Sequence, residues 1–206
     1  MVRRTSSSGA IAFVLIIAGI FAAGAGLGAL AGAPPFPGHG LAHAEPDGPA
    51  AKPMSRSTPM RISIPSINVD APITTVGLAP NGAIGVPPLD NNNLAGWYTG
   101  GPSPGQLGPA VIVGHVDGPQ GKSVFYRLGS VKPGQKIVLQ LANHHTALFN
   151  IYSVEYYKKG EFPGRRVYGD YSRPGLRLIT CGGSFLGGSV GYQDNIVVYA
   201  SLTDRG

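Results

Sequence analysis

The sequence predicts an all-β domain, and three observations lead to that fold class. Glycine and proline are frequent, with 32 and 19 residues among 206, and they separate short apolar runs along most of the chain. From Met60 onward these runs alternate apolar and polar residues, which is the pattern of half-buried strands. Almost no helical periodicity lies between them. This spacing favours a small closed barrel of about eight strands with short helical turns.

The N-terminal segment predicts a membrane anchor. Residues 1–8 are short and polar and carry only Arg3 and Arg4, and residues 9–33 contain no charged residue. The uncharged stretch exceeds the roughly 20 residues that a helix needs to cross a bilayer. Basic residues favour the cytoplasmic side. We therefore expect a single-pass protein of the cell membrane, with residues 1–8 in the cytoplasm, a signal-anchor helix at 9–33 and the remainder extracytoplasmic.

A cleaved signal peptide is the alternative interpretation of the same segment. The small residues of 31–33 and 42–44 both resemble signal peptidase sites. The apolar run is longer than the 7–15 residues or so that are typical of a signal peptide core, which favours a retained anchor. Both interpretations place the C-terminal domain outside the cytoplasm.

Residues 34–59 predict a linker, and residues 60–206 predict the globular domain. The linker is rich in proline, with glycine, alanine and serine between the prolines and few large apolar residues. Such a composition is typical of an extended, semi-rigid spacer. In the domain, a helical turn is expected at 123–128, between two glycines. The expected strands, in chain order, are 60–64, 67–70, 109–116, 136–141, 147–154, 176–181 and 195–202.

The charge pattern argues against nucleic-acid binding. The net charge is +6, but the basic residues are scattered and the longest basic runs are pairs. A nucleic-acid-binding domain is expected to gather its basic residues on one face or along one helix. The sequence also has no metal-ligand spacing and no phosphate-binding loop, so we expect neither a metal ion nor another cofactor.

The single cysteine, Cys181, is a candidate nucleophile. An exported protein with one cysteine has no intramolecular disulfide, and its thiol is a candidate for reactivity. In a strand at 176–181, Cys181 shares a face with Arg177 and Ile179. It precedes Gly182 and Gly183, so we expect it at the end of a strand that opens onto a flexible loop, where reactive groups are often presented.

His115 is the candidate base. It follows the apolar run at 110–113 and precedes a turn-forming sequence. A thiol needs a base or a cation nearby to be deprotonated at neutral pH, and histidine is the usual partner. Cysteine and histidine distant in sequence and adjacent in the fold are the arrangement expected of such a pair.

These motifs resemble those of the sortases, most closely the class E/F group of high-GC Gram-positive bacteria. The resemblance covers roughly residues 60–202, and the anchor and linker fit the layout of that family. It rests on the Gly-His-Val-Asp block around His115 and above all on the Leu-Ile-Thr-Cys-Gly-Gly block around Cys181. Further matching segments are 65–69, 121–128 and 194–199.

The resemblance implies an eight-stranded barrel with a hydrolytic and transpeptidase activity. In that family a cysteine attacks the Thr–Gly bond of a Leu-Pro-x-Thr-Gly-like sorting signal and forms an acyl-thioester. An amine of a peptidoglycan precursor then resolves the thioester, which anchors the substrate protein to the cell wall. The resemblance makes Cys181 the nucleophile, and it makes His115 the residue that protonates the leaving amine and deprotonates the incoming one.

The sequence departs from the family at a third position. Sortases use an arginine from the strand after the cysteine loop, whereas the only arginine after Cys181 here is Arg205, beyond the final strand. Gln193 and Arg127 are the candidates for supporting the oxyanion or the substrate. Arg177 shares the face of Cys181 but lies about 13 Å away along the strand.

The missing arginine leaves open a catalytically impaired sortase-like barrel that binds sorting-signal peptides without forming an acyl adduct on Cys181. A further alternative is a structural envelope protein whose thiol is buried and inert. Rapid reaction of Cys181 with a thiol reagent at neutral pH would exclude that structural role.

Overall fold

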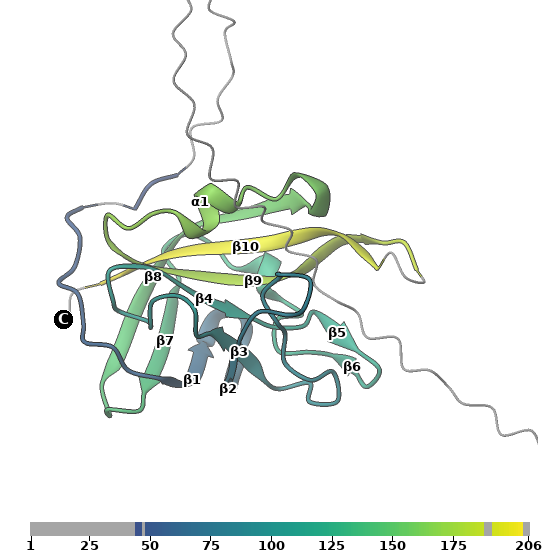
Figure 1. Cartoon of the computed structure of the whole chain (residues 1–206), viewed down its shortest axis with the longest axis horizontal. Coiled ribbons are helices and arrows are strands. Elements are labelled where there is room, and N and C mark those ends of the chain that lie inside the picture. Colours follow the sequence, from purple (N-terminus) through teal and green to yellow (C-terminus); the bar gives the residue numbers. More distant parts are fainter. Residues whose placement is uncertain (1–43, 47, 188–190, 204–206) are drawn as a thin grey trace, which may run out of the picture.

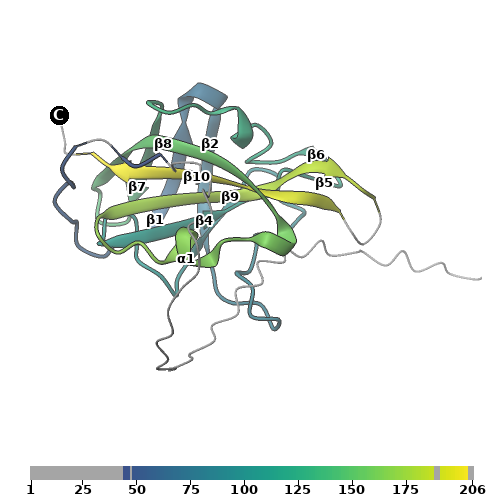
Figure 2. The same ribbon diagram turned by 90° about the horizontal axis from the view of Figure 1, so that it is seen from above.

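Eight strands close into one barrel in the computed structural model, which describes residues 44–46, 48–187 and 191–203 (Figures 1 and 2). The order around the barrel is β1, β2, β3, β4, β9, β10, β8 and β7, and the pairing of β7 with β1 closes it. The predicted all-β fold and the closed barrel of eight strands are therefore confirmed.

The barrel strands are β1 (Pro59–Ile64), β2 (Val69–Val76), β3 (Ala95–Tyr98), β4 (Gly108–Val113), β7 (Lys136–Leu141), β8 (Thr146–Lys158), β9 (Pro174–Phe185) and β10 (Tyr192–Leu202). A separate ribbon pairs β5 (Asp117–Gly118) with β6 (Gly121–Lys122). The helical segments that the structure describes are short, namely the 3-10 helices η1 (Pro65–Ile67), η2 (Leu128–Ser130) and η3 (Lys159–Glu161) and the α-helix α1 (Gly164–Tyr168).

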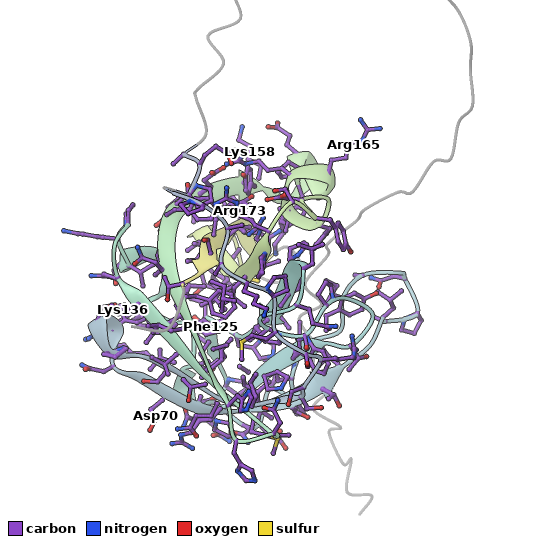
Figure 3. All side chains as sticks on the ribbon, turned by 90° about the vertical axis from the view of Figure 1, so that its left-hand side faces the viewer. Asp70, Phe125, Lys136, Lys158, Arg165 and Arg173 are labelled. Atoms are coloured by element: carbon purple, nitrogen blue, oxygen red, sulfur yellow. The ribbon has the colours of Figure 1, made fainter. Side chains whose placement is uncertain are left out.

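The barrel interior and its outer face hold two separate apolar clusters. On β9, Leu176 and Leu178 belong to the interior cluster, whereas Ile179 belongs to the outer one, as the alternation of side chains along a strand requires. Phe125 is fully buried in the interior cluster and lies near the centre of the molecule in Figure 3, while Asp70 lies at its periphery.

The connection between β8 and β9 covers the outer face. It carries η3 and α1, and Val167 of α1 packs in the outer cluster with Val111 of β4 and Val197 of β10. Arg166 of α1 donates hydrogen bonds to Glu155 of β8, so this connection is tied to the sheet beneath it. One side of the barrel wall is therefore covered, and its residues are buried on both faces.

Three neighbouring strands position the segments that carry His115 and Cys181. β4 runs parallel to β9 with Val113 opposite Ile179, and β9 runs antiparallel to β10. Parallel pairing brings the C-terminal ends of β4 and β9 to the same edge of the sheet. Residues that directly follow β4 therefore lie beside the second half of β9.

Several boundaries differ from the sequence prediction. β9 continues through Gly182 and Gly183 to Phe185, so Cys181 lies within the strand and the expectation of a strand end there was wrong. β3 and α1 were not predicted. In the expected helical turn at 123–128, the chain forms turns, and regular 3-10 geometry begins only at Leu128.

Part of the predicted linker lies against the barrel. Ala51 belongs to the interior cluster, Met54 packs against it, and the Met54 N–H donates to the Gly105 carbonyl at 2.8 Å. The predicted anchor at 9–33 lies outside the described residues. Within the described part of the chain, no helix has both the length and the apolar character needed to cross a membrane.

Candidate active site

His115 follows β4 by two residues, and Cys181 lies on the neighbouring strand β9. The Gly114 N–H donates to the Ile179 carbonyl at 3.1 Å, one residue beyond the last pair of β4 and β9. Continued by one more residue, this register would pair His115 with Cys181 across one strand spacing of about 4.8 Å. The topology thus brings the segments that carry the two residues, which are 66 positions apart in the sequence (181 − 115), to the same edge of the sheet.

A backbone carbonyl holds the imidazole of His115. The ring is buried, with 7% of the residue exposed, and Nε2 lies 2.8 Å from the Pro87 carbonyl oxygen. A carbonyl oxygen only accepts hydrogen bonds, so Nε2 carries a hydrogen in this arrangement. In the neutral ring, Nδ1 is then the nitrogen that is free to accept a proton.

The Cys181 thiol is partly buried among charged groups. Burial raises the pKa of the Cys181 thiol, the positive charge of Lys159 on η3 opposes that rise, and the negative charge of Asp117 on β5 adds to it. Burial decides the direction because the charged thiolate loses hydration in a poorly solvated site. The resting site therefore holds mostly the neutral thiol at neutral pH.

A hydrogen bond joins the segment after His115 to β10. The Tyr192 hydroxyl donates to the Asp117 carboxylate, and the Tyr192 ring lies 5.1 Å from that of Phe185 at the end of β9. Burial, followed by the hydrogen bond to Asp117, raises the pKa of Tyr192 to about 12. Figures 1 and 2 show the β5–β6 ribbon beside the far part of the β9–β10 hairpin, where this bond forms.

Gln193 lies on the rim of a pocket next to this hairpin. It is exposed on β10, and the pocket of about 300 Å³ is lined by Lys158, Lys159, Gly160, Tyr192, Gln193 and Asp194. Gln193 lies at the register shift between Tyr192 and Asp194, two residues before Asn195, the partner of Cys181 in the β9–β10 ladder. Lys159, which also lines the pocket, is the cation that acts on the Cys181 thiol.

The two arginines considered from the sequence have different environments. Arg127 is exposed, and it precedes η2, where its backbone carbonyl accepts a hydrogen bond from Ser130. Arg177 is 2% exposed, stacks on the Tyr199 ring at 4.7 Å and lies 3.9 Å from Asp170. Arg177 is therefore a packing residue of the outer face, and its guanidinium does not extend toward Cys181.

Four residues near Cys181 were not identified from the sequence, namely Asp117, Lys159, Tyr192 and Asn195. Asp117 follows His115 by two positions and falls in the block used for the family resemblance, so a signal for it was present. The other three depend on which residues face each other across β9, β10 and η3, which strand alternation alone does not give. In the described part of the chain, no group of three or more His, Cys, Asp or Glu side chains is placed to hold a metal ion.

Comparison with known proteins identifies the family. The sortase domain family matches residues 62–203, well over half of the chain. No curated protein sequence matches it. Known sortase structures share its fold at low sequence identity, and at this identity the likeness supports the fold alone.

Three of these structures illustrate the match. Sortase A from Corynebacterium diphtheriae is 21% identical with a TM-score of 0.57, and the match covers 74% of this chain but only 63% of that one. Sortase C-1 from Actinomyces oris is 20% identical with a TM-score of 0.56, and the match covers 70% of this chain and 73% of that one. The Clostridium perfringens sortase D5 transpeptidase is 18% identical with a TM-score of 0.53, and the match covers 72% of this chain and 79% of that one. Assignment to class E/F stays a prediction. The match over residues 62–203, well over half of the chain, shows that the chain belongs to the sortase family.

Proposed function

We propose that this chain is a cysteine transpeptidase that cleaves a C-terminal Leu-Pro-x-Thr-Gly-like sorting signal and transfers the protein to an amine of a peptidoglycan precursor. The observation that carries the proposal is the parallel pairing of β4 with β9, which brings the segment that carries His115 to the part of β9 that carries Cys181. Membership of the sortase family supports the reaction class. The sorting signal and the acceptor follow from the resemblance of the motifs.

The first half of the reaction forms an acyl-enzyme. His115 takes the proton of the Cys181 thiol, and the resulting thiolate attacks the carbonyl carbon of the Thr–Gly bond, so a C–S bond forms and the carbonyl oxygen becomes an oxyanion. When the intermediate collapses, the C–N bond breaks and the leaving glycine amine takes a proton from His115. The products are the acyl-thioester on Cys181 and the released C-terminal peptide.

The second half transfers the acyl group. An acceptor amine attacks the thioester carbon and gives its proton to His115, and the C–S bond breaks to return the thiolate. Because Nε2 is held by the Pro87 carbonyl, Nδ1 is the nitrogen that exchanges these protons. The proton taken in this half replaces the one given in the first, so no other reactant is required.

The oxyanion needs a donor in place of the family arginine. Gln193 lies on β10 two residues before the partner of Cys181 and offers a neutral amide donor, and Arg127 offers a cation from an exposed turn. Lys159 supplies positive charge that acts on Cys181 directly, because it opposes the rise in the thiol pKa. We favour Gln193 as the hydrogen-bond donor, with Lys159 as the source of positive charge.

The proposed setting is the outer surface of the cell membrane. The uncharged segment at 9–33 is proposed to anchor the chain, with residues 1–8 in the cytoplasm and the barrel outside. Sorting-signal proteins and a cell-wall amine are both extracytoplasmic, so this arrangement presents Cys181 to both reactants.

Mass spectrometry of the full-length chain tests the proposal. Incubation with a Leu-Pro-x-Thr-Gly peptide is expected to add the mass of the Leu-Pro-x-Thr acyl group to Cys181, and an added amine should remove it. Cys181→Ala should abolish the adduct, and His115→Ala should lower its rate of formation at least a hundredfold, in line with the contribution of a general acid. His145→Ala is the matched control, because His145 is exposed and directly precedes β8, whereas η3 follows the other end of that strand.

The same experiment separates the alternatives. Peptide binding without an adduct would favour the sortase-like binding barrel over the enzyme. An adduct that forms equally well in His115→Ala would contradict the role proposed for His115. Absence of both binding and thiol reactivity would leave a structural envelope protein as the remaining interpretation.

A further inference from the structure

The buried side chain of Asn195 lacks hydrogen-bond partners. Asn195 on β10 is 0% exposed, and neither its Nδ2 nor its Oδ1 has a hydrogen-bond partner within the described structure. Buried amides are nearly always paired, because water removed from them is not replaced. An unpaired amide is therefore destabilising, and its presence at this position calls for a functional reason.

Asn195 lies directly opposite Cys181. The two residues are partners in the antiparallel β9–β10 ladder, so their side chains share one face of the sheet. Side chains in such pairs have Cβ atoms about 4.5–5.5 Å apart. On the same face the next pair along the ladder is Ile179 with Val197, and both are apolar. Across the other ladder the partner of Asn195 is Tyr157 of β8, whose hydroxyl is already bonded to Glu155 and Tyr199. The Cys181 sulfur is therefore the other polar group that the two ladders place opposite this carboxamide.

Other asparagines show what a structural carboxamide does in this chain. The Oδ1 atoms of Asn81, Asn91 and Asn143 each accept a hydrogen bond from the backbone N–H two residues later, which stabilises a turn. Asn195 lies in a regular strand and has no such role. A leucine would fill the same volume in the outer face without burying a polar group.

We propose that Asn195 is a positioning residue whose Nδ2–H donates a hydrogen bond to the Cys181 sulfur and favours its thiolate form. This hydrogen bond is absent while Cys181 is a neutral thiol. When the thiol loses its proton, the carboxamide rotates about its side-chain bonds and forms the hydrogen bond. A hydrogen bond to the charged form favours that form. This inference extends the proposed function, because the thiolate is the nucleophile of that reaction.

Charged and titratable groups from other elements also act on this thiol. Lys159 on η3 favours the thiolate, Asp117 on β5 disfavours it, and Tyr192 on β10 interacts with the Cys181 charge. His115, two residues beyond the end of β4, is the proposed base for this thiol. Asn195 differs from all four because it is neutral at every pH, so its substitution changes the thiol without adding a titration of its own.

The test is the pH dependence of Cys181 alkylation in the full-length chain. Cys181 is the only cysteine, so the rate of reaction with iodoacetamide between pH 6 and 11 reports this thiol alone. Asn195→Leu is expected to move the midpoint upward by about one pH unit and to slow alkylation at pH 7 about tenfold. The same substitution should leave the melting temperature unchanged or raise it, since it removes an unpaired buried amide.

Thr180→Val is the matched control. The Thr180 hydroxyl is also fully buried and unpaired, but it belongs to the neighbouring residue and therefore to the opposite face of β9. Removal of the Thr180 hydroxyl should not change the pH midpoint of Cys181 alkylation. An unchanged midpoint in Asn195→Leu, or an equal shift in Thr180→Val, would overturn the proposal.

A second variant covers the case in which Asn195→Leu does not fold. Asn195→Asp keeps the shape of the side chain but replaces the donor with an acceptor. The pH midpoint of Cys181 alkylation should therefore rise by more than one pH unit. A midpoint equal to that of the unchanged chain would overturn the proposal as well.

Alkylation needs no sorting signal, so a shifted midpoint without a peptide adduct would reject the proposed function alone. An adduct with an unshifted midpoint would reject this inference alone.

Discussion

Burial of the Cys181 thiol determines how much nucleophile the site holds. Burial and the nearby Asp117 carboxylate raise the pKa of that thiol, while Lys159 limits the rise. At neutral pH the thiolate is therefore a minor species, and the reaction rate depends on groups that stabilise it when it forms. A neutral donor close to the sulfur then has a large effect, because a shift of one pKa unit changes the thiolate fraction tenfold.

The role proposed for Gln193 predicts a specific kinetic change. Gln193→Ala should lower the turnover number for transpeptidation at least tenfold, because the loss of an oxyanion donor destabilises the transition state. The KM should change little, because the oxyanion does not exist in the bound substrate. Steady-state kinetics with a sorting-signal peptide measures both. Gln140→Ala, an exposed glutamine on β7, is the control, and an unchanged turnover number for Gln193→Ala would rule out this role.

Cys181 and His115 were identified as candidates at the residue scale because each ends or follows a short apolar run, and their roles stay a prediction. Alternation along a single strand also predicts which neighbours share the face of Cys181, because it does not depend on the partner strand. Asn195 was not predictable, because its role depends on its register against β9. That register is set by a β-bulge between Tyr192 and Asp194, and a shift of one residue would reverse the face of every side chain on β10 beyond it.

The β9–β10 hairpin extends the site beyond the barrel. After Cys181 the strand passes through Gly182 and Gly183, and Gly183 adopts a positive φ of 75°. A Cβ at Gly183 would lie 2.3 Å from a carboxylate oxygen of Asp194 on the partner strand. The conformation and the close approach both require glycine there. The glycine that appeared to mark a loop in the sequence therefore permits tight pairing of two strands.

The hydrogen bond between Tyr192 and Asp117 predicts a change in stability. Tyr192→Phe removes the donor and leaves the partly buried carboxylate without it, so the free energy of unfolding should fall by about 1.5–3 kcal/mol. Urea denaturation of the two proteins measures the difference. Tyr171→Phe removes a hydroxyl from a side chain that is 56% exposed and should change the free energy by less than about 0.5 kcal/mol. Equal effects of the two substitutions would contradict the bond between β10 and β5.

At the scale of elements, strong alternation predicted β1, β7 and β8 well. β3 was missed because its four residues, Ala95–Tyr98, are too few for a period to emerge, and the strand exists because β2 and β4 pair with it. α1 is a single turn whose first residue is Gly164, and no side chain caps it. Its helical form comes from packing of Val167 on the outer face, which is a tertiary effect.

At the scale of the whole molecule, barrel closure was predictable from the number and spacing of the strands, whereas the covering of its outer face was not. That covering depends on polar contacts between segments distant in sequence. Tyr199 lies between two guanidinium groups, those of Arg166 at 5.0 Å and Arg177 at 4.7 Å. Arg166 in turn binds Glu155. These contacts fix the β8–β9 connection that carries Lys159, so they link the stability of the barrel wall to the charge beside Cys181.

Glu155 makes this covering sensitive to acid. Burial opposes ionisation of Glu155, but hydrogen bonds from Arg166, Tyr157 and Ser153 outweigh it and hold the pKa of that carboxyl below its ordinary value of 4.5. A carboxyl with a lowered pKa in the folded state stabilises the fold above pH 4.5. That stabilisation is lost as the pH falls below 4.5 and through the lowered value, because the folded state must then take up the proton.

Glu155→Gln is therefore expected to flatten the acid side of the stability curve. At pH 7 it should lower the free energy of unfolding by about 2 kcal/mol, since hydrogen bonds to the charged carboxylate are weakened. The deficit should shrink as the pH falls from 4.5 to 3, where the unchanged chain loses the same contribution. Urea denaturation at pH 3, 4, 5 and 7 measures it. Asp70→Asn breaks the ion pair between Asp70 and Arg61, whose side chains are 61% and 43% exposed, and it should change the stability little at any pH. A deficit for Glu155→Gln that stays constant across this range would show that Glu155 acts through packing alone.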